Sequence, residues 1–138
     1  METDPQTREW IVLYGSLMRG LGAMDSLGIS DRLRYVGPCL CSGELFDLGH
    51  YPGLRLGDAR VVGELFAPLD PHVLDVLDEF EGFDPERPRE SLYLRERVSL
   101  IQPAQTCAWI YFYNRVPEAG TRVVSGDWRA HLHSRRAS

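Results

Sequence analysis

Residues 11–20 read IVLYGSLMRG, and the rest of the chain is arranged around them. Three branched apolar residues and a tyrosine, with no charge among them, predict a buried strand. The strand ends at Gly15, because glycine adopts backbone angles that other residues avoid and lets a ligand approach the main chain closely. Main-chain amides at such a turn can point the same way and form a site for an anion. An ordinary turn after a core strand is the alternative interpretation.

A second stretch, residues 69–82, reads LDPHVLDVLDEFEG and predicts a helix. Asp70 is a good N-cap, Pro71 suits the first helical position, and Gly82 is a natural end. At about 100° per residue, one face of this helix is an apolar stripe made of Val73, Leu74, Val76, Leu77 and Phe80.

Glu81 falls within this apolar stripe, whereas Asp78 lies at its edge and Glu79 lies on the opposite face. Burying a carboxylate is costly unless it is paired or protonated. Desolvation therefore raises the pKa of such a carboxyl group toward the range useful for acid–base catalysis. If the last turn of the helix frays, Glu81 reaches solvent instead, and the sequence leaves this alternative open.

The fold class follows from the remaining apolar segments. Strands are predicted at residues 34–46, as a pair or as one long bent strand, and at 60–66, 92–100 and 107–113. About six strands and one clear helix predict an α+β fold built on a small mixed, mostly antiparallel β-barrel, because closure hides the edges of a sheet.

Length and charge restrict the class of protein. A chain of 138 residues suffices for one domain with its own core, which we place at residues 10–130. We expect a flexible N-terminal arm at 1–9 and a flexible C-terminal tail at 131–138. The formal net charge of −5, without a basic stripe, argues against a nucleic-acid partner, and no apolar run reaches the length of a membrane span. The polar start of the chain does not resemble a signal peptide, so we expect a cytoplasmic protein.

The cysteines and histidines do not predict a metal site. Cys39 and Cys41 face the same way on a strand, where a disulfide between them is unfavourable. Neither Cys107 nor the histidines add further ligands at a suitable spacing. We therefore expect reduced thiols. His50 is expected at the surface or at the rim of a site, although a catalytic base in another kind of enzyme is conceivable.

Two motifs, Tyr-Gly-Ser-Leu at 14–17 followed by Arg-Gly at 19–20, and Leu-Asp-Glu-Phe-Glu-Gly at 77–82, carry a family resemblance. Supporting motifs lie at residues 43–49, 51–53, 62–66, 93–95 and 111–114. In their order and spacing they resemble the gamma-glutamylcyclotransferase-like superfamily, and within it the bacterial members similar to gamma-glutamylamine cyclotransferase. The resemblance covers nearly everything from residue 10 to about 128.

The resemblance implies a barrel with flanking helices and an enzyme that cyclises the γ-glutamyl group of an amine or amino acid to 5-oxoproline, releasing the amine. It implies that Glu81 is the catalytic acid–base residue. The implied substrate-binding residues are Tyr14, Gly15, Ser16, Leu17 and Tyr113. Tyr93 and Arg95 would support the pocket, and the reaction needs no metal and no cofactor. The implied partner is a small γ-glutamyl compound, whose leaving amine the sequence does not define; nor does it define the oligomeric state.

Two other functions are compatible with the residues. Ser16 is a possible hydrolase nucleophile, but the Gly-x-Ser-x-Gly elbow is absent, because Met18 and Arg19 follow Leu17, and no histidine or acid partner is indicated. A non-catalytic ligand-binding or interaction protein on the same fold is the second alternative, because fold alone does not fix function.

Overall fold

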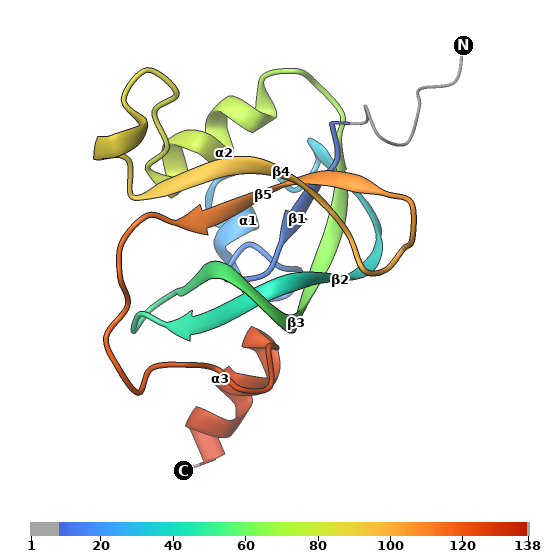
Figure 1. Ribbon diagram of the computed structural model, residues 1–138. Helices are drawn as coiled ribbons and strands as arrows, with labels where there is room; N and C mark the ends of the chain where they lie inside the picture. The colour runs from blue at the N-terminus through green and yellow to red at the C-terminus, as the bar shows by residue number, and fades with distance from the viewer. Residues whose placement is uncertain (1–8, 138) are drawn as a thin grey trace.

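Figure 1 shows the computed structural model, which describes residues 9–137 of the chain. Its elements are β1 (Ile11–Leu13), α1 (Ala23–Ser26), β2 (Leu33–Asp47), β3 (Pro52–Pro68), α2 (Val73–Glu81), the 3-10 helix η2 (Pro88–Glu90), β4 (Tyr93–Ser99), β5 (Cys107–Tyr113) and α3 (Trp128–Ala137). Of the predicted N-terminal arm, only Glu9 belongs to the described residues. None of the described helices combines the length and the apolar character that crossing a membrane requires.

One five-stranded sheet, in the order β2-β3-β1-β5-β4, forms the framework of the fold. The short strand β1 lies at its centre, antiparallel to β3 and parallel to β5. The remaining neighbours pair in antiparallel fashion. A central strand is covered on both faces, which explains why residues 11–13 are uncharged and at most 3% exposed.

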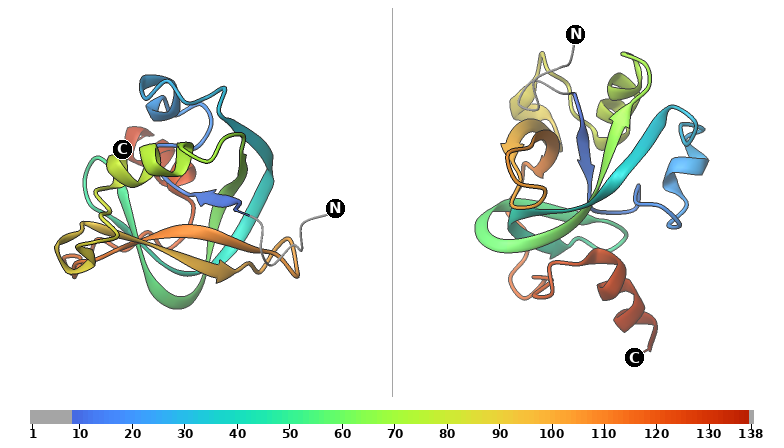
Figure 2. Two further views of the ribbon diagram at one scale, coloured as in Figure 1. Left: turned by 90° about the horizontal axis from the view of Figure 1, so that it is seen from above. Right: turned by 90° about the vertical axis from the view of Figure 1, so that its right-hand side faces the viewer.

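The sheet curls strongly but does not close into a barrel (Figure 2). Among residues 9–137, β2 and β4 remain its two edges, and five strands are found where about six were predicted. The β2 edge is partly covered by isolated bridges from Leu40 to Gln102 and from Phe46 to Arg122. The predicted α+β class and the mostly antiparallel sheet are confirmed, while the predicted full closure is not.

The hairpin of β2 and β3 is longer than the sequence indicates, because β3 begins at Pro52 and not near Arg60. Register shifts occur between Tyr35 and Gly37 and between Ser42 and Glu44, and such bulges bend a strand. The sequence alternative of one long bent strand at 34–46 is therefore the one observed.

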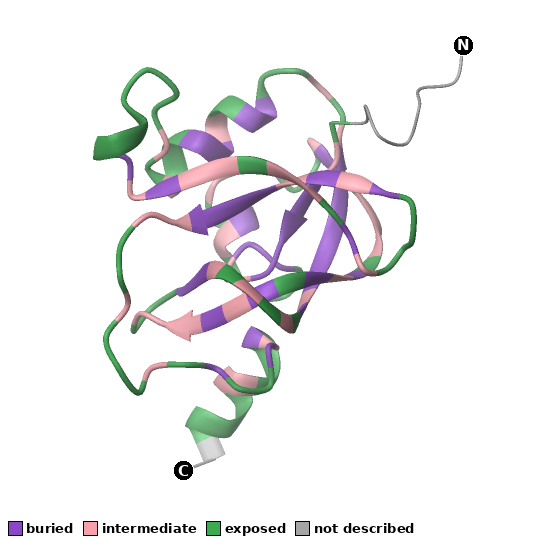
Figure 3. Ribbon diagram, in the orientation of Figure 1, coloured by how far each residue is buried: buried purple, intermediate pink, exposed green. Residues whose placement is uncertain are grey.

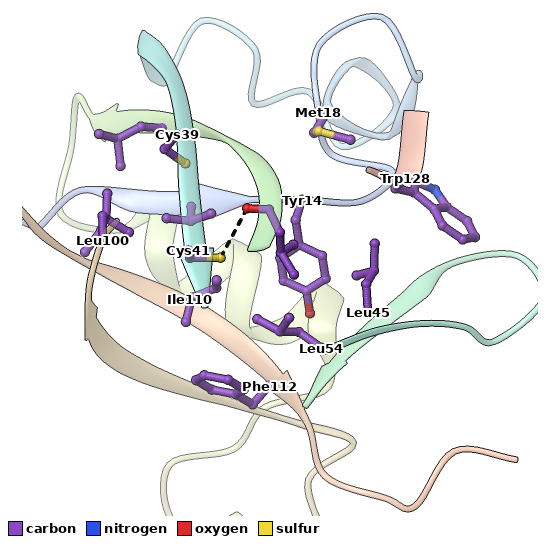
Figure 4. Packing of buried hydrophobic residues seen from close by; sticks show 14 of the residues in the cluster. Tyr14, Met18, Cys39, Cys41, Leu45, Leu54, Leu100, Ile110, Phe112 and Trp128 are labelled. Atoms are coloured by element: carbon purple, nitrogen blue, oxygen red, sulfur yellow. Dashed lines mark hydrogen bonds between the residues drawn. The ribbon is translucent and has the colours of Figure 1, made fainter. Parts of the chain in front are cut away.

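The core is divided between the two faces of the sheet. Along β1 the side chains alternate: Val12 and Tyr14 enter one cluster, and Ile11 and Leu13 enter the other. Figure 3 shows the buried residues along the strands, and Figure 4 shows Tyr14 in the first cluster, beside Leu54. The turn after β1 is thus held by packing on both sides of the sheet.

Helix α2 confirms the predicted helix and its end, because Gly82 adopts a left-handed conformation with a φ of 71°. The start of the helix differs from the prediction, because α2 begins at Val73 with His72 as its N-cap, so Asp70 and Pro71 precede it. Asp70 accepts a hydrogen bond of 2.8 Å from the His72 amide in the turn before the helix. Phe80 departs from the predicted stripe, since it is 44% exposed, whereas Asp78 is only 5% exposed.

Residues 131–137 of the predicted C-terminal tail belong to helix α3, and Ser138 lies outside the described residues. Helix α3 starts at the buried Trp128 and lies at the end of the molecule opposite α2 (Figures 1 and 2). His131 Nε2 lies 2.7 Å from Asp47 Oδ2, and Arg135 Nη1 donates to the Gly49 carbonyl over 2.9 Å. These partners belong to the end of β2 and the turn after it, so sequence proximity could not reveal them.

Candidate active site

A cavity of about 260 Å³ opens where the turn after β1 meets the end of α2. Its walls come from five parts of the chain, residues 12–17, 50–52, 80–81, 92–93 and 111. These segments are far apart in sequence and meet because β1 lies in the centre of the sheet. Both signature segments of the sequence, the turn after the first strand and the end of the helix, therefore contribute to one site.

Glu81 is the last residue of α2, and it lines this cavity. Desolvation by burial raises the pKa of its carboxyl group from an ordinary value of 4.5 to about 7. The residue as a whole keeps some exposed surface, but its carboxyl group has no hydrogen-bond or ion-pair partner within residues 9–137. A carboxyl group in this state is available to exchange protons with a ligand at neutral pH.

The turn at residues 15–17, which also lines the cavity, contributes main-chain amides. The Met18 amide donates to the Gly15 carbonyl over 2.9 Å and closes the turn. No acceptor for the amides of Gly15, Ser16 and Leu17 is found within the described residues. A Cβ on Gly15 would lie 2.8 Å from Pro52 Cγ, so glycine is needed for the close packing of this wall. The turn therefore offers free donors to an anion in the cavity.

Tyrosines form much of the remaining wall. The Tyr14 hydroxyl donates to the Tyr111 carbonyl over 2.6 Å, and the Tyr93 hydroxyl donates to the Pro52 carbonyl over 2.7 Å. Burial raises the pKa of both Tyr14 and Tyr93, and the nearby Glu81 carboxylate adds to the rise. Both phenols are therefore neutral, and their hydrogen bonds tie the wall together.

Tyr113, predicted as the substrate-binding tyrosine of β5, does not line the cavity. Its ring packs 5.5 Å from that of Tyr93, and it borders a different hollow of the surface. Tyr111, two positions earlier on β5, lines the cavity instead. Two tyrosines that are two positions apart lie on the same face of a strand, so their spacing alone does not distinguish them.

Arg95 pairs with Asp78 and lies outside the cavity lining. Its guanidinium group donates from Nε to Asp78 Oδ1 over 2.7 Å and from Nη2 to Oδ2 over 3.1 Å. The Tyr111 hydroxyl donates to the same carboxylate over 2.7 Å. Asp78, which the helix pattern placed at the edge of the stripe, is therefore the buried and fully paired carboxylate of α2. The supporting role of Arg95 stays a prediction, but its partner is now identified.

The wall segment at residues 50–52 includes His50, at the rim that the sequence analysis expected, and Tyr51, which it did not single out. No residue of the loop at 83–91, which follows the end of α2, lines the cavity. A Tyr-Pro-Gly turn was the available signal for the 50–52 wall, yet a turn motif does not tell which surface it covers.

No group of three or more potential metal ligands is found in the part of the chain that the structure describes. Cys39 and Cys41 are buried free thiols, and burial raises the pKa of each to about 12. Cys107 is also free and only partly buried. None of the three cysteines lines the cavity.

Comparison with known proteins gives the chain clear relatives. The sequence model of the family described as "Gamma-glutamyl cyclotransferase, AIG2-like" matches residues 11–130. A protein of Citrobacter rodentium (strain ICC168) named "Gamma-glutamylcyclotransferase family protein ytfP" is 34% identical over 118 residues, which cover 86% of this chain and 93% of that protein.

Solved structures share the fold. The solution NMR structure of protein ytfP from Escherichia coli aligns with a TM-score of 0.62 at 30% identity, over 89% of this chain and 98% of that one. The crystal structure of an uncharacterized protein from Pyrococcus horikoshii aligns with a TM-score of 0.69 at 17% identity, over 94% and 97% of the two chains. The second likeness concerns the fold alone.

Proposed function

The chain belongs to the gamma-glutamyl cyclotransferase, AIG2-like family, and on this premise we propose that it converts the γ-glutamyl group of a small γ-glutamyl amine or amino acid into 5-oxoproline. The observation that carries the proposal is Glu81. Its carboxyl group lines a cavity, has no protein partner within residues 9–137, and has a pKa that burial raises to about 7.

Substrate binding is assigned to the turn at residues 15–17. The free amides of Gly15, Ser16 and Leu17 would donate hydrogen bonds to the α-carboxylate of the γ-glutamyl group, since partial positive charge gathers where several amides converge. Holding this end fixed lets the substrate fold back, so that its α-nitrogen meets its own γ-carbonyl carbon. Intramolecular positioning of this kind removes much of the entropic part of a barrier.

Glu81 is assigned the proton transfers. As a carboxylate it takes a proton from the α-ammonium group, and the resulting amine attacks the γ-carbonyl carbon. As a carboxylic acid it then returns this proton to the leaving nitrogen, and the original amide bond breaks. The ring nitrogen loses its second proton to the same carboxylate, which passes it to the released amine. A group whose pKa is close to the working pH performs both steps efficiently.

The overall reaction balances without water, oxidant or cofactor. One carbon–nitrogen bond forms in the lactam ring, and one carbon–nitrogen bond to the leaving amine breaks. The two protons that the α-ammonium group loses end on the released amine. The substrate's own nitrogen is favoured over water as the nucleophile, because it is held next to the γ-carbonyl carbon within the same molecule.

The test is to incubate the purified chain with a panel of γ-glutamyl amines, amino acids and peptides and to measure 5-oxoproline by mass spectrometry. Turnover by the wild-type chain that is lost in the Glu81→Gln variant supports the proposal. Binding of a γ-glutamyl compound without any turnover, in the wild type and the variant alike, favours the non-catalytic alternative and refutes an enzymatic role.

The setting of this activity is also a proposal. Three free cysteines, two of them buried, are typical of a reducing compartment, and we place the protein in the cytoplasm with a small molecule as its partner. Measuring the fraction of the chain released with other cytoplasmic proteins after cell fractionation tests this location.

A further inference from the structure

A groove of about 470 Å³ runs along α3 beside the candidate active site. One side of it is formed by Leu132, Arg135 and Arg136 of α3, and the other side includes Ser16 and His50. The same Ser16 and His50 also line the cavity that contains Glu81. The groove and the cavity therefore meet at these two residues, and a chain that leaves the cavity past Ser16 enters the groove.

The charged side chains that line this groove are all positive. Arg135 and Arg136 line it, and no carboxylate does. Arg135 is already engaged, since Nη1 donates to the Gly49 carbonyl over 2.9 Å and lies 3.4 Å from Asp47 Oδ2. Arg136 has no hydrogen-bond or ion-pair partner within residues 9–137. Arg136 is thus an available cation at the end of a path that begins at the cavity.

The position of this cation is defined by the fold. The contacts from His131 to Asp47 and from Arg135 to the Gly49 carbonyl fasten α3 to the turn that carries His50. Trp128 fixes the start of the helix, because it is 1% exposed. Arg136 follows one residue after this fastened part of the helix.

We infer that the groove along α3 holds the leaving part of the substrate, and that Arg136 makes the enzyme prefer a leaving group that carries a carboxylate over an uncharged one. This inference rests on the proposed function and specifies which γ-glutamyl compounds that site turns over best. The γ-glutamyl group fills the cavity, while the leaving amino acid or peptide extends past Ser16 and places its carboxylate near Arg136. Arg136 is a specificity-determining residue and takes no part in the chemical steps.

A second hollow, of about 700 Å³, gives the rival path. It shares Tyr51 with the cavity, and its charged lining residues include Glu118, Arg122 and Asp47. Its charges are mixed, and Arg122 lies 3.8 Å from Glu44. A free carboxylate is therefore attracted less strongly here than at Arg136, and Arg122 provides a matched control.

The experiment compares γ-glutamyl-alanine with γ-glutamyl-alaninamide, whose leaving parts have nearly the same shape but carry a carboxylate and an uncharged carboxamide, respectively. We expect the wild type to show a higher kcat/KM for the acid by about two- to fivefold, the range that exposed ion pairs reach. Arg136→Glu should abolish or invert this preference through KM, with kcat for the amide unchanged, because the interaction is present equally in substrate and transition state. Raising the salt concentration should reduce the preference of the wild type toward that of the variant.

The controls are Arg122→Glu in the rival hollow and His133→Glu, which is exposed on α3 and lines neither path. Both should keep the wild-type preference. Equal turnover of the two compounds by the wild type, or loss of the preference in Arg122→Glu but not in Arg136→Glu, overturns this inference and leaves the proposed function standing. No 5-oxoproline from either compound, or from the wider panel, overturns the proposed function and this inference with it.

Discussion

Asp78 binds Arg95 through two hydrogen bonds, of 2.7 and 3.1 Å, so the carboxylate of α2 that is paired with a cation is not Glu81. The Tyr111 hydroxyl donates to the same Asp78 carboxylate. Asp78 also receives the Phe83 amide at its main-chain carbonyl, over 2.8 Å. These contacts hold the last turn of α2 against β4 and β5 and leave Glu81 free to face the cavity.

The first prediction concerns this pair. Arg95→Ala leaves the Asp78 carboxylate without its cation. The side chain of Asp78 is only 8% exposed, so solvent cannot replace this partner well. We expect the free energy of unfolding to fall by about 2–4 kcal/mol, slightly less than for a fully buried pair. Urea unfolding followed by circular dichroism measures the loss. Arg87→Ala, at an exposed pair in the loop before η2, serves as the control and should change stability little. A loss below about 0.5 kcal/mol for Arg95→Ala contradicts the supporting role.

The second prediction concerns catalysis. Glu81→Gln keeps the shape of the side chain and removes its ability to exchange protons. We expect kcat to fall by about 10²- to 10⁴-fold on a confirmed γ-glutamyl substrate, with ligand binding retained. Glu79→Gln, two residues earlier and exposed, is the matched control and should keep near wild-type turnover. If Glu79→Gln is the inactive variant, the assignment of the acid–base residue is wrong.

The third prediction concerns pH and stability. Burial raises the pKa of Glu81 from 4.5 to about 7 in the folded chain, so folding favours its protonated form. The contribution of the protonated Glu81 to the free energy of unfolding is present in full below pH 4.5 and is lost as the pH rises through 7. We therefore expect Glu81→Gln to melt at the same temperature as the wild type near pH 4.5 and several degrees higher at pH 8. Melting curves across this range test it, and a difference that is constant with pH refutes the raised pKa.

The fourth prediction concerns the turn after β1. A Cβ on Gly15 would lie 2.8 and 2.9 Å from two carbons of Pro52, so Gly15→Ala must displace one wall of the cavity. We expect weaker binding of γ-glutamyl compounds and of small carboxylates, and a still larger loss for Gly15→Val. Calorimetric titration measures both. Gly37→Ala has no atom within 4 Å of the new Cβ and no positive φ, so it should leave binding unchanged.

The sequence predicted those parts of the site that are encoded by local patterns. Gly82 ends α2 with a φ of 71°, and this end places Glu81 at the mouth of the cavity. The uncharged run at 11–13 likewise identified the central strand, because burial on both faces demands apolar residues. In both cases the physical cause lies within one segment of the chain.

Features that depend on contacts between distant segments could not be predicted in this way. Asp78 can be buried because Arg95 of β4 and Tyr111 of β5 form hydrogen bonds with its carboxylate. A helical wheel shows neither of these partners. The order of helix α3 depends in the same way on Asp47, 84 positions before His131. Whether Tyr111 or Tyr113 lines the cavity depends on where α2 ends over the sheet. The two-residue period of a strand does not encode this position.

The central place of β1 in the sheet has a consequence for synthesis of the chain. Ile11 pairs with Phe66 of β3 on one side and with Trp109 of β5 on the other. The first strand to be synthesised therefore cannot complete its pairing until the last strand, β5, has been made. A nascent chain that stops before β5 carries both the glycine turn and Glu81, but it lacks the strand that supplies Tyr111. Such non-local pairing slows folding and keeps apolar strand edges exposed in the meantime. The protein therefore acquires its cavity only after nearly the whole polypeptide has been made, and truncated products are expected to be bound by chaperones.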